Sequence, residues 1–247
     1  MINRVRSGHQ LRGTHLAIML CVLAAALPQV ARAQDTVGRT VTLPNVRGEP
    51  EPGTTFVANW TAVEAGLNDL LNRPRRDDAA VIEEVKAMGD AAPPPYLMEM
   101  GRRIAATDPV EGAYWFRLGY LRTQWAAFAC ADTTARQASI VVLTALENAE
   151  QGLVERFDQP ELRLPAYERL GDGDAVFQST ASAWWICSHG MLAMTAGLQA
   201  SRGESRTIPL SVWLAPEATR ASMQARLRAY LPQWAADDRA ALTDADR

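Results

Sequence analysis

The residues that could perform chemistry are few, and His189 is the first of them. It shares a segment with Ser179, Ser182 and Ser188, so a serine and histidine pair for acyl transfer would depend on it. The chain has no Gly-x-Ser-x-Gly turn, which positions the nucleophile in many such hydrolases. A histidine in a tryptophan-rich apolar segment is more typical of a hydrogen-bonded core residue, and we favour that role for His189.

Carboxylates offer a second route, because hydrolysis of a glycan needs two acids on either side of one cleft. Glu147, Glu150 and Glu155 share one predicted helix, and the pair Glu204-Ser205 is similar to the acid and serine pair of lytic transglycosylases. The longer glycine and aromatic motif of those enzymes is missing, and acids in polar segments are usually solvated. A peptidoglycan-directed hydrolase using carboxylates therefore stays an alternative, to be tested at Glu150 and Glu204.

Metal binding has little basis in the sequence. Asp172-Gly173-Asp174 supplies two carboxylates but lacks the other ligands of a calcium loop, and Asp174 is better interpreted as a helix cap. We assign no catalytic residue, no metal site and no cofactor, and we favour a function that is not enzymatic.

The first 33 residues have the organisation of a secretory signal peptide. Arg4, Arg6 and Arg12 precede an apolar run over residues 16–27, and Ala31-Arg32-Ala33 provides a small-x-small cleavage site. A membrane span needs about 20 apolar residues, and this run is shorter. We predict cleavage after Ala33, no membrane span after cleavage, and a periplasmic or secreted protein.

Charge narrows the classes of partner. Cleavage after Ala33 removes four of the 25 basic side chains and none of the 28 acidic ones, which leaves a formal charge of about −7. Nucleic acid is therefore not an expected partner, because its affinity for proteins comes largely from neutralised phosphates.

Lys86 is the only lysine, and the excess of arginine and alanine favours a bacterial origin with GC-rich coding.

Two cysteines, Cys130 and Cys187, remain after cleavage. In an oxidising compartment an even pair favours a disulfide, while two unpaired buried thiols are the alternative. A disulfide that closes the long loop between Cys130 and Cys187 would stabilise the fold by about 4 kcal/mol, because it restricts the conformational entropy of the unfolded chain.

The remaining chain divides by composition into three parts. Residues 34–59 are rich in glycine, proline and threonine and are interpreted as an extended or disordered leader, residues 60–236 as a helical domain, and residues 237–247 as an acidic tail. Helical periodicity predicts an all-α, irregular bundle of six to eight helices without strands. The expected helices start with a capping box at Thr61, and two more cover residues 79–88 and 95–106. The next helix begins at Pro109 with an apolar stripe that reaches Phe128, and a long helix follows a cap at residues 132–134 and runs to about Phe157. Further helices cover residues 175–200 and 216–230, with a short helix or loop at 160–170.

The clearest unit is an antiparallel hairpin of the helix 95–106 and the helix that begins at Pro109. Asp108 is suited as N-cap of the second helix and Pro109 as its first residue. Apolar stripes face one another across the hairpin; they comprise Tyr114, Leu118, Leu121, Trp125 and Phe128 on the second helix and Leu97, Met100, Ile104 and Ala105 on the first.

The segment 108–122 resembles the second half of a Sel-like repeat of the tetratricopeptide superfamily. Gly112 and Gly119 take the positions of the family's small residues, and Trp115-Phe116 takes that of its aromatic pair. The first helix lacks the family's Leu-Gly-x-x-Tyr core, and the pattern covers about 30 residues without repeating, whereas a solenoid needs about three units. The resemblance implies one tetratricopeptide-like hairpin and a role in protein binding.

Arg117, Tyr120 and Gln124 fall on the helix face opposite the main apolar stripe. Arginine and tyrosine are frequent contact residues in interfaces, so we predict that this face is exposed and binds a protein, with an ordinary solvated face as the alternative. The sequence thus favours an exported, non-catalytic protein-binding or assembly factor of the cell envelope, with a protein partner.

Overall fold

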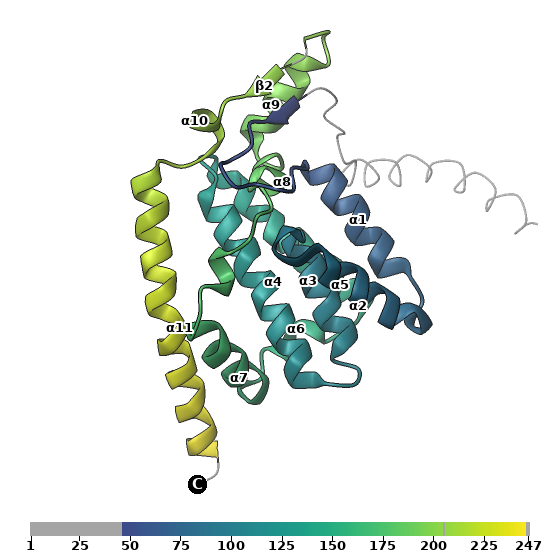
Figure 1. Ribbon diagram of the computed structural model, residues 1–247, viewed down its shortest axis with the longest axis vertical. Coiled ribbons are helices and arrows are strands. Elements are labelled where there is room, and N and C mark those ends of the chain that lie inside the picture. The colour runs from purple at the N-terminus through teal and green to yellow at the C-terminus, as the bar shows by residue number, and fades with distance from the viewer. Residues whose placement is uncertain (1–45, 205, 246–247) are drawn as a thin grey trace, which may run out of the picture. The chain divides into compact units, whose positions relative to one another are not determined.

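The computed structural model of the protein describes residues 46–204 and 206–245. The predicted signal peptide 1–33, its cleavage site after Ala33 and residues 34–45 of the leader lie outside the described residues. The expected all-α class is confirmed, because helices make up most of the described chain (Figure 1). These helices are α1 (Trp60–Asn72), α2 (Asp78–Met88), α3 (Pro94–Ile104), α4 (Pro109–Ala129), α5 (Ala138–Ala149), α6 (Leu153–Phe157), α7 (Pro160–Gly171), α8 (Trp184–Cys187), α9 (Met191–Ala200), α10 (Leu210–Trp213) and α11 (Glu217–Ala245).

Two short strands, which the sequence did not predict, complete the fold. β1 (Val46–Gly48) pairs in parallel with β2 (Arg206–Ile208), with Arg47 opposite Thr207. Residues 46–59, expected to belong to the leader, run mostly extended, and Phe56 forms a further bridge with Ala181. Strands of three residues are too short to show an alternating pattern in the sequence.

The hairpin of α3 and α4 forms the core of the helical unit. Every residue of α3 is buried, and the two helices run antiparallel in close contact. Glycine permits this contact, because a Cβ at Gly101 would lie 2.5 Å from the backbone nitrogen of Phe116, and one at Gly119 would lie 2.6 Å from the carbonyl oxygen of Pro94. The predicted N-cap of α4 is present, since the Asp108 side chain accepts a hydrogen bond from the Glu111 amide at 3.0 Å.

Two helices that were expected to be continuous are broken. The segment 133–157 is a short 3₁₀ helix followed by α5 and α6, with Gly152 in the left-handed region between them (φ 75°). The segment 175–200 contains a 3₁₀ turn, an extended stretch, α8 and α9. All four residues of α8 are buried, whereas Met191 and Leu192 at the start of α9 are exposed, so only part of this apolar segment belongs to the core.

The predicted disulfide is present. Cys130 and Cys187 are joined with an S–S distance of 1.99 Å, which links the end of α4 to α8. Next to the bridge, side chains from another segment cap the start of α9: the Leu192 amide donates to Asp132 at 2.7 Å, and the Met191 amide donates to the Thr134 hydroxyl at 2.9 Å.

In the part of the chain that the structure describes, no helix combines the length and the apolar character needed to cross a membrane.

α11 continues beyond its expected end at Tyr230 and runs to Ala245, through most of the predicted acidic tail. Its second half packs against α7 through the buried side chains of Leu231 and Ala235. Asp238 is also buried and forms an ion pair with Arg163 of α7. α11 therefore passes beside both α7 and α4, and this position creates the groove described next (Figure 1).

Candidate functional site

The predicted recognition residues of α4 occupy two different environments. Arg117 is buried, so its predicted exposure is wrong; its Nη2 donates to the carbonyl oxygen of Phe157 at 2.8 Å and pairs with Asp158 at 2.6 Å. The reason is that the end of α6, Asp158 after it and Tyr167 of α7 cover this part of α4. Tyr120 and Gln124, one and two turns further along, are half-buried and line an open groove.

This α4–α11 groove has a volume of about 480 Å³. Its lining residues are Tyr120, Leu121, Gln124, Trp125, Phe128, Arg136, Met223, Arg226, Leu227, Tyr230 and Trp234. The first half of α11, residues 217–230, has no fully buried residue, so its apolar side chains at the groove are only partly covered. The groove is therefore an apolar surface that the fold leaves unfilled.

Aromatic rings give the groove defined walls. Tyr230 stacks on Trp234 with ring centroids 5.7 Å apart, and Trp234 also contacts Tyr167 of α7. On the other side, Trp125 packs edge-on against Phe177 at 5.4 Å. Such rings bury a large area at a small entropic cost because they have few rotatable bonds.

The charged side chains that line the groove are Arg136 and Arg226. Arg136 lies over the Phe128 ring, 4.8 Å from its centroid, and Arg226 approaches the Tyr230 hydroxyl at 3.5 Å. Among residues 46–204 and 206–245, neither arginine forms an ion pair, although most of the other arginines do. Two cations without a carboxylate partner thus border an apolar surface.

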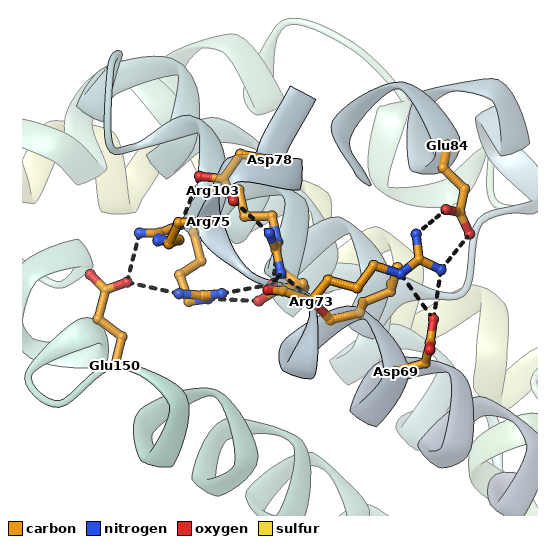
Figure 2. Close-up of polar contacts among 10 residues, drawn as sticks. Asp69, Arg73, Arg75, Asp78, Glu84, Arg103 and Glu150 are labelled. Carbon is orange, nitrogen blue, oxygen red and sulfur yellow. Dashed lines mark hydrogen bonds and ion pairs between the residues drawn. The ribbon is translucent and has the colours of Figure 1, made fainter. Parts of the chain in front are cut away.

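A second cluster of charges joins α3 to α1 and α2, and its arginines, unlike Arg136 and Arg226, are paired with carboxylates. Glu99 of α3 is fully buried and accepts hydrogen bonds from Arg102 at 2.7 and 2.8 Å and from Arg103 at 2.6 Å. Arg103 continues to Asp78, and Arg102 continues to Glu150 at 3.1 Å (Figure 2).

The pairing extends outward from this cluster to the surface. Arg75 also pairs with Glu150, and Arg73 joins Asp69 to Glu84 (Figure 2). Arg156 pairs with Glu150 as well. Every arginine in the cluster has a carboxylate partner, and the charges balance. The cluster therefore joins the helices to one another and leaves no charge for a ligand.

The carboxylates considered for hydrolysis are engaged in structural contacts. Glu147 accepts hydrogen bonds from the amides of Val154 and Gly152 at the start of α6, and these bonds lower its pKa. Glu150 belongs to the ionic cluster, and Glu204 lies exposed in the loop before β2, next to the undescribed residue 205. The structure does not bring Glu150 and Glu204 into contact.

Asp174 is likewise not the helix cap that the sequence favoured. Its side chain makes no capping hydrogen bond and instead accepts from Arg228 of α11 at 2.9 and 3.0 Å. In the described chain, no group of three potential ligands among His, Cys, Asp and Glu is placed to hold a metal ion.

His189 and the serines near it take part in packing. The His189 ring lies 4.5 Å from the Trp60 ring, and burial lowers its pKa. Ser188 accepts a hydrogen bond from the Trp60 amide at 2.7 Å, and Ser182 accepts one from the Trp184 amide at 3.2 Å. Within the described ranges, no hydrogen bond joins His189 to these serines, and all three side chains help to anchor the start of α1 and α8.

Sequence reasoning missed the contribution of α11 to the groove. Met223, Leu227, Tyr230 and Trp234 follow one another at intervals of four, three and four residues, which is the spacing of one helical face. This signal was available, but the predicted helix ended at Tyr230.

Comparison of the chain with protein-family models, with curated proteins and with solved structures finds no match.

Proposed function

We propose that the protein is a non-catalytic protein-binding or assembly factor of the bacterial cell envelope and that it recognises its partner through the α4–α11 groove. The observation that carries this proposal is the composition of the groove. Its lining combines five aromatic side chains, a methionine and two arginines and includes no lysine, aspartate or glutamate. Aromatic residues, methionine and arginine are enriched in protein interfaces, whereas lysine and acidic residues are depleted there.

The position of Tyr120 and Gln124 supports the same surface. Both residues were selected from the sequence as parts of a binding face, and both line the groove. They project from the second helix of the hairpin that resembles a tetratricopeptide-like unit, a family whose hairpins bind proteins. Loss of Arg117 from the predicted face leaves these two residues as its exposed part.

Export to the envelope is supported by the disulfide, because such bonds persist in oxidising compartments and are rare in the cytosol. It is also consistent with the signal peptide that the sequence predicts. The hydrolase alternative gains no support, because Glu150 is bound by three arginines and does not meet Glu204.

The test is affinity capture from an envelope extract with the protein in its disulfide-bonded form, followed by mass spectrometry. Met223→Asp places a charge in the groove at a half-buried position, and Leu198→Asp places the same charge on α9, where Leu198 is 60% exposed. We expect the native protein and the Leu198→Asp control to capture a partner that Met223→Asp does not capture. The Met223→Asp variant should have the same Tm as the Leu198→Asp control, which shows that it is folded.

Identical captured proteins for the native chain and for a folded Met223→Asp variant would contradict the proposal. That result would show that the groove takes no part in recognition.

A further inference from the structure

We infer that the occupant of the α4–α11 groove is an amphipathic α-helix of the partner that carries acidic residues beside its apolar stripe. The inference rests on the proposed function and specifies the chemistry of the partner. It has three supports: the length of the groove, its uncovered apolar wall and its unpaired cations.

The length suits a helix. The lining residues extend over nine positions of α4, from Tyr120 to Phe128, and over twelve positions of α11, from Met223 to Trp234. At a rise of 1.5 Å per residue, the first and last of these positions lie about 12 Å apart on α4 and about 17 Å apart on α11. A helix that presents apolar anchors at i, i+3 or i+4, and i+7 covers about 10 Å, so such anchors fit along the groove.

The wall is uncovered because only the second half of α11 has buried residues; the first half is held at the surface by the ion pairs of Arg220 with Glu51 and of Arg228 with Asp174. Leu231, Ala235 and Asp238 bury the second half, whereas Met223 and Leu227 in the first half are partly exposed. A third helix lying between α4 and the first half of α11 would bury these side chains in the way that neighbouring helices bury those of a bundle.

The charge selects an acidic helix. Arg136 and Arg226 border the groove without a carboxylate partner in the described chain, and the groove lining includes no acid. The chain as a whole has a formal charge of −3, so these two cations are a local reversal of its overall sign. Glutamates flanking the apolar stripe of a bound helix would meet them, as complementary charges do across specific interfaces.

The experiment compares two synthetic, fluorescently labelled helical peptides of about 18 residues, or five turns. They share one leucine stripe, and the flanking positions carry glutamate in the first peptide and lysine in the second. Binding to the complete, disulfide-bonded chain is measured by fluorescence anisotropy. We expect the glutamate peptide to bind about tenfold more tightly, because its carboxylates would pair with Arg136 and Arg226, whereas lysines at the same positions would meet like charges.

Variants locate the effect. Arg226→Glu changes an exposed side chain, so the fold should persist while the preference for the glutamate peptide is lost or inverted. Met223→Asp should weaken both peptides, and Leu198→Asp should weaken neither.

Four results would overturn the inference. Equal binding of both peptides removes the acidic preference, and failure of both peptides removes the helix as occupant. Tight binding of laurate that Met223→Asp abolishes, with no peptide binding, assigns the groove to a small anionic amphiphile. Self-association that Met223→Asp abolishes assigns it to a second copy of the chain. The capture experiment can succeed in each of the first two cases, so the proposed function is judged separately.

Discussion

Replacement of Glu99 by glutamine removes the charge at the centre of the buried ionic cluster and keeps the shape of the side chain. In the native chain, the Glu99 carboxylate accepts three hydrogen bonds of 2.6 to 2.8 Å from Arg102 and Arg103, and it is fully buried. After the change, Arg103 retains Asp78 and the carbonyl oxygens of Leu70 and Arg73. Arg102 retains only Glu150, at 3.1 Å. The cost therefore falls mainly on Arg102.

The magnitude follows from this loss of compensation. Removal of one member of a buried ion pair costs about 3–5 kcal/mol, because the other charge stays buried without its partner. Glutamine can still accept a hydrogen bond, so we expect Glu99→Gln to lower the free energy of unfolding by about 3 kcal/mol. For a domain of this size, that loss lowers Tm by about 6 to 12 °C.

The assay is urea unfolding of the disulfide-bonded protein, with Glu84→Gln as the control. Glu84 pairs with Arg73 at the surface, where an ion pair contributes about 1 kcal/mol or less. The double variant Glu99→Gln/Arg102→Met should recover part of the loss, because it also removes the unpaired cation. A loss in Glu99→Gln no larger than that in Glu84→Gln would refute the reasoning and would mean that the cluster is hydrated.

Three further perturbations test the fold. Gly101→Ala should lower the free energy of unfolding by about 1–3 kcal/mol, because its Cβ would overlap the backbone of α4, whereas Gly173→Ala, with open space around it, should change little in the same urea titration. Replacement of Cys130 and Cys187 by alanine should cost about 4 kcal/mol, because the bridge closes a separation of 57 residues, and calorimetry under non-reducing conditions would measure it. Burial lowers the pKa of His189, so the folded state favours the neutral ring; the stability that this provides is present above the ordinary value of about 6.5 and is lost as pH falls below it. His189→Asn should therefore show a smaller loss of unfolding free energy between pH 7 and pH 5 than the native protein, and an unchanged loss would contradict this assignment.

Local chemistry made part of the fold predictable. Asp108 caps α4 because its carboxylate reaches an amide three residues away, and that contact depends on nothing else in the chain. The same local reasoning selected Thr61 as the first cap, but Asn59 takes this role and accepts from the Ala62 amide at 3.0 Å. Both residues are good capping residues, so only the path of the preceding chain decides between them.

The breaks in the two long predicted helices have a different origin. The sequence pattern of an apolar run such as residues 183–187 is the same whether the run belongs to a long helix or to the single turn of α8. The extended stretch before it is held by contacts with distant segments, as when the Ser182 amide donates to the Phe56 carbonyl oxygen at 2.8 Å. The pairing of β1 with β2 is likewise between distant segments, and no local pattern specifies it.

Arg117 and Arg226 show why the candidate site needed the structure. On the sequence both are arginines on predicted helices, and Arg117 was assigned to a binding face because it lies, with Tyr120 and Gln124, opposite the main apolar stripe. In the fold, Arg117 is paired with Asp158, which directly follows α6, and lies over the Tyr167 ring of α7, whereas Arg226 borders an apolar groove whose lining has no acid. An arginine whose charge is already balanced by a carboxylate gains less from another anion, so the unpaired side chain is the better candidate for recognition. The balance of charge around an arginine is therefore a better guide to a candidate binding surface than the presence of the arginine, and here it supports the proposed recognition on the side of α4 that faces α11.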